Sequence, residues 1–296
     1  MRNLITWVVV IAVLGGVGFF MPRFAPEIMA VFRQGTDLSA YERAVLDCRS
    51  GDTQRELAGC TWLIDSGEVE DDEIMSLAHH NRGLAHAAQG NHDDAFADYE
   101  AAIKYDPEDY ITYYVRGYLH HVREDYDIAV ADYTSALERY DEDPDVYRDR
   151  ATALYYNGKY EESIPDLQAA LKLDPEDAET LNWLAWTLLT IGRAEEAMPL
   201  SAKSLEQDEE KNAGSLDTYA HILAELGRHQ EAFDYFVKAA RVGDSDYVRT
   251  IQNALTSKGF LSSPPDGVLT GRTREALRAC IAQNCRLQLD DVLSTN

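Results

Sequence analysis

The chain has 296 residues, with 27 lysines and arginines against 52 aspartates and glutamates, so its formal net charge is −25. This charge repels the phosphates of nucleic acids and anionic lipid headgroups, which excludes both as electrostatic partners. Hydrophobic residues make up 45% of the chain, which is ordinary for a globular protein. Residues 37–243 carry a net −27, whereas residues 1–36 carry +2 and residues 244–296 are neutral. The chain therefore divides into three parts, and only the middle part is acidic.

The first part contains a long apolar run. Residues 4–21 read LITWVVVIAVLGGVGFFM, with no charge and Thr6 as the only polar side chain. A helix of this length just crosses a hydrocarbon core of about 30 Å. A cleaved signal peptide is the alternative, but the run ends in bulky Phe-Phe-Met-Pro rather than in the small residues that signal peptidase needs. We therefore predict a single transmembrane anchor and linker over residues 1–36.

The acidic part contains a repeat of 34 residues. Small residues recur at this spacing in three registers, and four of the five units carry a glycine between their halves. Each unit therefore reads as two short helices: the glycine supplies the left-handed conformation that ends the first helix, and the small residues let the helices approach closely. Large residues fill the grooves that remain, and proline ends the second helix in two units. The positions are Gly83, Gly117, Ala151, Ala185 and Ala220; Ala95, Ala129, Ser163, Ala197 and Ala232; Ala102, Ala136, Ala170, Ser204 and Ala239; the turn glycines Gly90, Gly158, Gly192 and Gly227; the large residues Tyr99, Tyr133, Leu167 and Phe236; and the pairs Asp106-Pro107 and Asp174-Pro175.

This pattern resembles the tetratricopeptide repeat family. The resemblance implies an all-α fold, a solenoid of stacked helical hairpins with five repeats over residues 76–246 and a degenerate one over residues 37–75. The second unit departs from the pattern by carrying Glu124 at the position of the turn glycine, and the fourth has Glu209 in place of proline. We expect these departures to weaken single turns without changing the fold.

The same resemblance implies a binding surface. In this family the first helix of each unit lines a concave groove, and the matching positions here are mostly aromatic with little positive charge. We expect the groove to bind an extended or helical segment of a partner protein, neutral or basic in character, because aromatic side chains give large contact areas. An alternative assigns several of these rings to the core between repeats. The predicted groove residues are Tyr114, Tyr118, His121, Arg148, Tyr155, Tyr156, Asn182, Trp183 and Trp186.

The neutral C-terminal part predicts two amphipathic helices. The first carries an apolar stripe and stops at Gly259, the second begins at Thr270 or Gly271, and a Pro-Pro-Asp-Gly turn lies between them. The patterns I-Q-x-A-L-x-x-x-G-F, D-G-V and T-R-x-A-L over residues 247–290 resemble the peptidoglycan-binding-like helical domain of bacterial cell-wall proteins. The resemblance implies a wall-associated location more strongly than it implies glycan binding. The matching residues are Ile251, Gln252, Leu255, Gly259, Phe260, Asp266, Gly267, Val268, Thr273, Ala276 and Leu277.

The four cysteines fall into two local pairs, Cys48 with Cys60 and Cys280 with Cys285. Four cysteines allow three pairings, and a zinc site would need closer spacing and further ligands, which the nearby histidines do not supply. We therefore predict two local disulfides and no metal site. Disulfides persist in oxidising compartments, which agrees with the cell-wall resemblance and places the chain after the anchor outside the cytoplasm.

The sequence carries no nucleophile elbow, phosphate loop, HExxH motif or dinucleotide fingerprint. We therefore expect no enzyme activity, no catalytic residues and no cofactor. The prediction is a non-catalytic scaffold or adaptor, held in the bacterial inner membrane by a single pass with its soluble part in the periplasm, where the solenoid binds a protein and the terminal module contacts peptidoglycan. Three alternatives stay open: a factor for cytochrome c maturation or other envelope assembly, an accessory to a peptidoglycan hydrolase, and, with reversed topology, a cytosolic adaptor.

Overall fold

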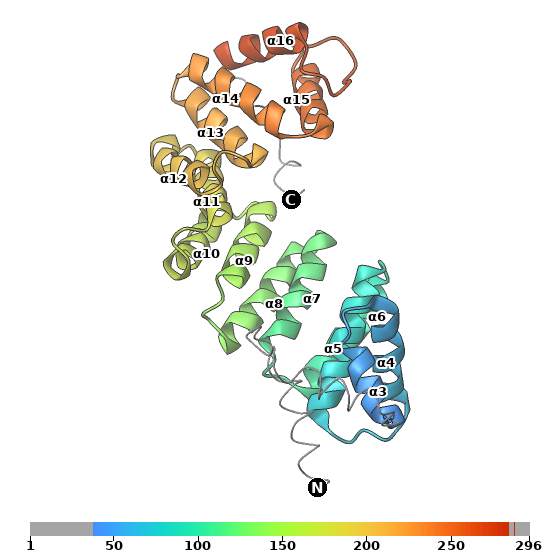
Figure 1. The fold of residues 1–296 in the computed structure, drawn as a ribbon. Helices are drawn as coiled ribbons and strands as arrows, with labels where there is room; N and C mark the ends of the chain where they lie inside the picture. Colours follow the sequence, from blue (N-terminus) through green and yellow to red (C-terminus); the bar gives the residue numbers. More distant parts are fainter. Residues whose placement is uncertain (1–37, 284–286, 288–296) are drawn as a thin grey trace, which may run out of the picture.

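The computed structural model describes residues 38–283 and residue 287. Within these residues the fold is all-helical, with fourteen helices, α3 to α16, and no strand. Successive helices run antiparallel as hairpins, and the hairpins stack into an elongated, curved solenoid (Figure 1). The predicted transmembrane anchor lies outside the described residues, and none of the helices in the described part is long and apolar enough to cross a membrane.

Six hairpins and one further helix pair follow one another along the chain. The five predicted repeats correspond to the hairpins from α5 to α14, and the degenerate repeat corresponds to the short hairpin before them. The helices are α3 (Ala40–Cys48) and α4 (Thr53–Asp65); α5 (Asp72–Ala88) and α6 (His92–Tyr105); α7 (Tyr110–Val122) and α8 (Tyr126–Arg139); α9 (Pro144–Tyr156) and α10 (Tyr160–Leu173); α11 (Ala178–Thr190) and α12 (Ala194–Gln207); α13 (Ala213–Glu225) and α14 (His229–Val242); and α15 (Ser245–Ser257) and α16 (Gly271–Ala282).

The small residues lie where the two helices of a hairpin cross. A Cβ atom added to Gly83 would lie 2.7 Å from the ring of Tyr99, and one added to Gly117 would lie 3.0 Å from the ring of Tyr133. These rings fill the space beside the crossing, and burial of one aromatic side chain contributes about 2–3 kcal/mol. The large residues that we predicted to fill the spaces beside the helix crossings are all at most 1% exposed: Tyr99, Tyr133, Leu167 and Phe236.

The turn between the two helices of each repeat needs one left-handed residue. The four predicted turn glycines have φ between 73° and 81°, and Glu124 takes the same conformation in the second unit with φ of 64°. A residue with a Cβ atom loses about 1–2 kcal/mol in this conformation. After α12, where the repeat lengthens to 35 residues, both Glu209 and Glu210 have positive φ. The hairpin geometry therefore imposes the turn even where the sequence departs from glycine.

A repeated ion pair joins the two helices in the first three units. The guanidinium group of an arginine on the first helix donates two hydrogen bonds, 2.6–2.8 Å long, to a carboxylate sixteen residues later on the second helix. We call these three pairs the ionic clasps. They are Arg82–Asp98, Arg116–Asp132 and Arg150–Asp166.

In the last two units, the clasp positions are apolar or aromatic. Leu184 and Leu200 stand there in the fourth unit and belong to one hydrophobic cluster. Tyr219 and Tyr235 stand there in the fifth unit, with ring centroids 4.7 Å apart. One position of the repeat is therefore filled by charge in three units and by hydrophobic contact in two.

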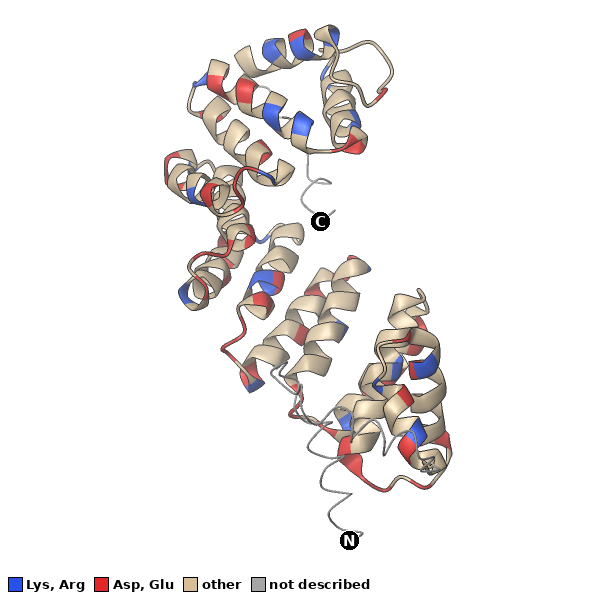
Figure 2. Cartoon of the chain, viewed as in Figure 1, with Lys and Arg blue, Asp and Glu red and all other residues tan. Residues whose placement is uncertain are grey.

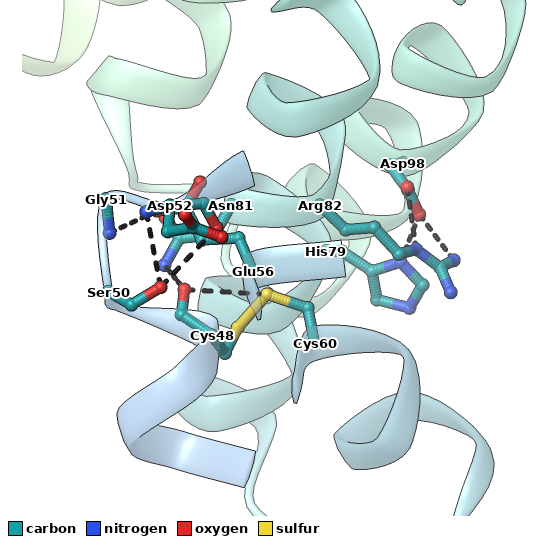
Figure 3. Close-up of a disulfide and its surroundings, with 10 residues drawn as sticks. All are labelled: Cys48, Ser50, Gly51, Asp52, Glu56, Cys60, His79, Asn81, Arg82 and Asp98. Carbon is teal, nitrogen blue, oxygen red and sulfur yellow. Dashed lines mark hydrogen bonds and ion pairs between the residues drawn. A yellow bond between two sulfur atoms is a disulfide. The ribbon is translucent and has the colours of Figure 1, made fainter. Parts of the chain in front are cut away.

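The first hairpin is closed by a disulfide. Cys48 and Cys60 are bonded across α3 and α4, as predicted, and the side chain of Asn81 on α5 donates to the carbonyl of Cys48 at 2.9 Å (Figure 3). The disulfide hairpin is thereby joined to the first full repeat. The second predicted disulfide, Cys280–Cys285, includes a cysteine outside the described residues and stays a prediction.

The C-terminal helix pair packs directly on the last repeat. Phe236 of α14, Ile251 of α15 and Leu277 of α16 belong to one cluster of buried residues. The loop between α15 and α16 is held by Gln252, whose Oε1 accepts from the backbone N–H groups of Asp266 and Gly267 at 2.9 Å each. The side-chain nitrogen of Gln252 donates to the carboxylate of Asp266 at 2.7 Å. These residues of the peptidoglycan-binding-like pattern therefore have a structural role, which is to fix this loop.

Candidate protein-interaction surface

The nine predicted groove residues lie on the first helices of three successive units, and their exposure differs widely. Tyr118 on α7 is 55% exposed, whereas Tyr155 on α9 and Trp183 and Trp186 on α11 are at most 7% exposed. The indole N–H of Trp186 donates to the hydroxyl of Tyr155 at 2.7 Å. These three rings are part of the hydrophobic core between the third and fourth units, in agreement with the alternative that assigned several of the rings to the core between repeats. Asn182 is also buried, and Tyr114, His121, Arg148 and Tyr156 are partly buried.

His121 and Tyr156 pack with Tyr126 in an aromatic cluster that joins the second and third units. The ring centroids lie 5.4–5.8 Å apart. Burial lowers the pKa of His121, so its imidazole is neutral at pH 7. These two predicted groove residues therefore contribute contacts between repeats.

An apolar hollow lies between α5, α6 and α7. Its volume is about 440 Å³, and three of its large apolar side chains, Leu84, Tyr118 and Val122, are exposed. It occurs where α6 and α7 pack against each other less extensively than do the facing helices of the other successive hairpins between α3 and α14. An exposed apolar hollow of this kind indicates an interaction surface. The lining residues are Leu84, Ala87, Ala88, His92, Tyr99, Tyr114, Val115, Tyr118, Leu119 and Val122.

An acidic cluster surrounds Arg148 on α9. The Nη1 atom of Arg148 lies 2.7 Å from a carboxylate oxygen of Asp145 and 3.4 Å from one of Asp177. Its Nε atom lies 3.7 Å from Asp149 and 3.8 Å from Glu179. One guanidinium therefore faces four carboxylates, and the cluster keeps an excess of negative charge.

The raised pKa of Asp149 reflects mainly its burial. Burial, together with the nearby carboxylates of Glu179 and Asp145, raises the pKa of Asp149 to about 6, although the hydroxyl of Tyr114 and the guanidinium of Arg148 act in the opposite direction. Asp145 and Glu179 are the accessible members, with side chains 57% and 63% exposed. A cation from outside the chain would therefore be stabilised here.

Tyr114 connects the hollow with the acidic cluster. Its ring lines the hollow, and its hydroxyl donates to a carboxylate oxygen of Asp149 at 2.8 Å. The apolar and acidic surfaces are therefore neighbours.

The loops between units extend the negative charge. Figure 2 shows acidic residues in the loops that lead from the second helix of one unit to the first helix of the next. The acidic residues of these loops lie within 106–109, 141–145, 174–177 and 208–210. One edge of the solenoid is therefore strongly acidic.

Near the C-terminal end, the inner surface of α13 is covered by residue Leu287. The Nε2 atom of His221 on α13 lies 2.7 Å from the carbonyl oxygen of Leu287, and its Nδ1 atom lies 3.0 Å from the carbonyl oxygen and 3.2 Å from the carboxylate of Asp217. Both ring nitrogens face acceptors, an arrangement that favours the protonated imidazolium. Burial opposes this charge, but Asp217 outweighs it and raises the pKa of His221.

Within residues 38–283 and 287, no group of three or more histidine, cysteine or acidic side chains is arranged to hold a metal. The N-terminal histidines have structural contacts. The Nδ1 atom of His79 lies 2.8 Å from the carboxylate of Asp98, beside the clasp from Arg82 (Figure 3).

Comparison with known proteins supports the repeat fold. The family model of the tetratricopeptide repeat matches residues 80–145 and 148–211. The solved structure of YrrB, described as a TPR protein with an unusual peptide-binding site, is 22% identical, with 61% of this chain and 91% of that chain covered and a TM-score of 0.52. No curated protein matches the sequence.

MamA is a second similar protein. One MamA structure, from AMB-1, is 21% identical over 62% of this chain and 93% of its own, with a TM-score of 0.51. Another is 17% identical over 64% and 98%, with a TM-score of 0.52. The described solenoid therefore has the tetratricopeptide repeat fold, as the 34-residue spacing predicted.

Proposed function

We propose that this protein is a non-catalytic scaffold or adaptor that binds a segment of a partner protein at the hollow between α5 and α7. The observation that carries this proposal is the exposed apolar surface of Leu84, Tyr118 and Val122 around an open hollow. Proteins with this repeat fold are generally non-catalytic scaffolds for protein–protein interaction, and one similar solved structure is described as having a peptide-binding site. The negative charge of the solenoid favours a neutral or basic partner.

We also propose that the protein is held in the bacterial inner membrane by residues 4–21, with the remainder in the periplasm. The uncharged run of eighteen residues supports the anchor, and the Cys48–Cys60 disulfide supports an oxidising compartment. The resemblance of residues 247–290 supports contact between the C-terminal module and peptidoglycan. An enzyme reporter that is active only in the periplasm, fused after Asn296, tests the topology: activity is expected, and a cytosolic signal would contradict the location.

The binding function is tested by crosslinking in cells. A photoreactive amino acid at Tyr118 is expected to crosslink one partner protein, identified by mass spectrometry. The matched control places the same amino acid at Ile128 on α8, which is 50% exposed but does not line the hollow. Equal crosslinks from both positions, or none from Tyr118, would contradict the proposal.

A further inference from the structure

Building on the proposed binding function, we infer that the hollow and the acidic cluster around Arg148 together recognise one type of segment: a large apolar side chain with a lysine or arginine within a few residues of it. The hollow binds the apolar side chain, and Asp145 and Glu179 bind the basic group.

The apolar half of this assignment rests on the size and lining of the hollow. Its volume of about 440 Å³ falls within the range of about 300–1,000 Å³ typical of pockets that enclose small ligands. The wall combines the exposed rim of Leu84, Tyr118 and Val122 with the buried side chain of Leu119 at the bottom. A large aliphatic or aromatic side chain would remove this apolar surface from water, which is the main source of affinity at such a contact.

The basic half rests on the charge that Arg148 leaves uncompensated. Its guanidinium lies within 4 Å of four carboxylates, two of which have mostly exposed side chains. Burial acts to lower the pKa of Arg148, but the carboxylates of Glu179, Asp149, Asp145 and Asp177 outweigh it and raise that pKa, so a further positive charge beside the cluster would be favourable. The acidic loop 141–145 adds to the same field.

Tyr114 fixes how the two halves lie relative to each other. Tyr114 lines the hollow, and its hydroxyl donates to a carboxylate oxygen of Asp149 at 2.8 Å, so one tyrosine side chain joins the hollow to the buried member of the cluster. Adjacent residues of an extended segment rise about 3.3 Å each, so a basic residue a few positions from the apolar one extends past Tyr114 towards Asp145 and Glu179.

The charge of the chain argues against a second copy as the occupant. The solenoid carries a net −27, so a second solenoid approaching the acidic cluster would be repelled. The same negative charge attracts a partner segment that carries a basic residue.

The inference is tested with a displayed library of random twelve-residue peptides, selected on the full chain in detergent. Enriched peptides are expected to share a Phe, Leu, Ile or Met with a Lys or Arg within a few residues of it. A fluorescent peptide of the enriched sequence is then titrated by anisotropy. Tyr118→Ala is expected to weaken its binding about tenfold or more. Asp145→Asn with Glu179→Gln is expected to weaken it about threefold to tenfold and to reduce its dependence on salt.

The matched control removes the same charge elsewhere: Glu138→Gln with Glu161→Gln, both exposed on the second helices α8 and α10, is expected to leave the affinity unchanged. Circular dichroism establishes that each variant is folded. An enriched peptide that Tyr118→Ala weakens but that binds the Asp145→Asn, Glu179→Gln variant as tightly as the parent chain, or one that lacks a basic residue, overturns this inference and leaves the proposed function standing. A peptide that binds the Tyr118→Ala variant as tightly as the parent chain contradicts the proposed function as well. Failure to enrich any peptide overturns both.

Discussion

The first three repeats and the last two fill the same position in different ways. The first three use the ionic clasps, whose carboxylates have side chains only 5–10% exposed, whereas the last two use leucine or tyrosine pairs. The hydrophobic clusters follow this division. One cluster runs continuously from Leu205 through the last repeat into α16, while the cluster between α5 and α7 consists of Ala95, Tyr99 and Leu119.

The difference separates the part of the solenoid that continuous hydrophobic contact stabilises from the part that leaves apolar surface exposed. A buried ion pair gives little net stability after desolvation, although it fixes the geometry of the two helices. Hydrophobic pairs give stability but need continuous contact with their neighbours. The hollow occurs in the part with clasps, where the buried cluster between units is small, so apolar surface is left exposed there, and this is the surface at which we propose that a partner binds. The C-terminal part has buried the corresponding surface within itself.

The largest effect is expected from breaking one clasp on one side. Asp132→Ala leaves the guanidinium of Arg116 without its partner and should lower the free energy of unfolding by about 3–4 kcal/mol, measured by urea denaturation. The double change Arg116→Leu with Asp132→Leu copies the fourth unit and should recover most of this loss. Asp127→Ala, which removes an exposed partner of Lys159, is the control and should have little effect. If the double variant is as unstable as the single one, the comparison between charged and apolar units fails.

The next effect is expected at the N-terminal end. Replacing both Cys48 and Cys60 by serine opens a bridge that spans 12 residues and should destabilise the first hairpin by about 2–3 kcal/mol. Hydrogen exchange should show loss of protection in α3 and α4 but not in α13 and α14. Reducing the unmodified chain should reproduce the result, and uniform loss of protection along the solenoid would contradict it.

A smaller effect is expected from the buried charge in the otherwise apolar C-terminal part. The pKa of His221 is raised above its usual value near 6.5, so its stabilising contribution is complete below about pH 6.5 and is lost as the pH rises through the raised value. The loss should be of the order of one charge-assisted hydrogen bond, about 2 kcal/mol. Thermal unfolding against pH checks this. His221→Gln should be less stable at pH 6 and should lack this step, and a parallel pH profile in the variant would refute the assignment.

The smallest expected effect is an increase in the free energy of unfolding. Glu124→Gly removes the Cβ atom from a left-handed residue and should stabilise the second repeat by about 1 kcal/mol, measured by denaturation. The opposite change, Gly158→Ala at the equivalent turn, should cost about as much. A loss on introducing glycine would mean that the side chain of Glu124 has a role that the backbone does not explain.

Much of the fold could be predicted because the repeat places small residues wherever helices cross. The clasps could also have been found, since arginine recurs at 82, 116 and 150 and aspartate sixteen residues after each. The hollow could not, because it depends on how closely α7 approaches α6, and no residue pattern encodes that distance. The sequence also could not decide whether Trp183 and Trp186 lie in the groove or in the core between repeats, and the structure shows them buried. Residues 180–189 of α11 are all buried, because α11 also packs against α13.

The core shared by α14, α15 and α16 has a consequence for assembly. A stack of identical hairpins ends in an apolar face, onto which another hairpin can add, and repeat proteins need a different terminal element to stop this growth. Here Ile251 and Leu277 cover that face, and the loop held by Gln252 keeps them in place. The helix pair α15 and α16 thus covers the apolar face of the last repeat, as the capping element of a repeat protein does.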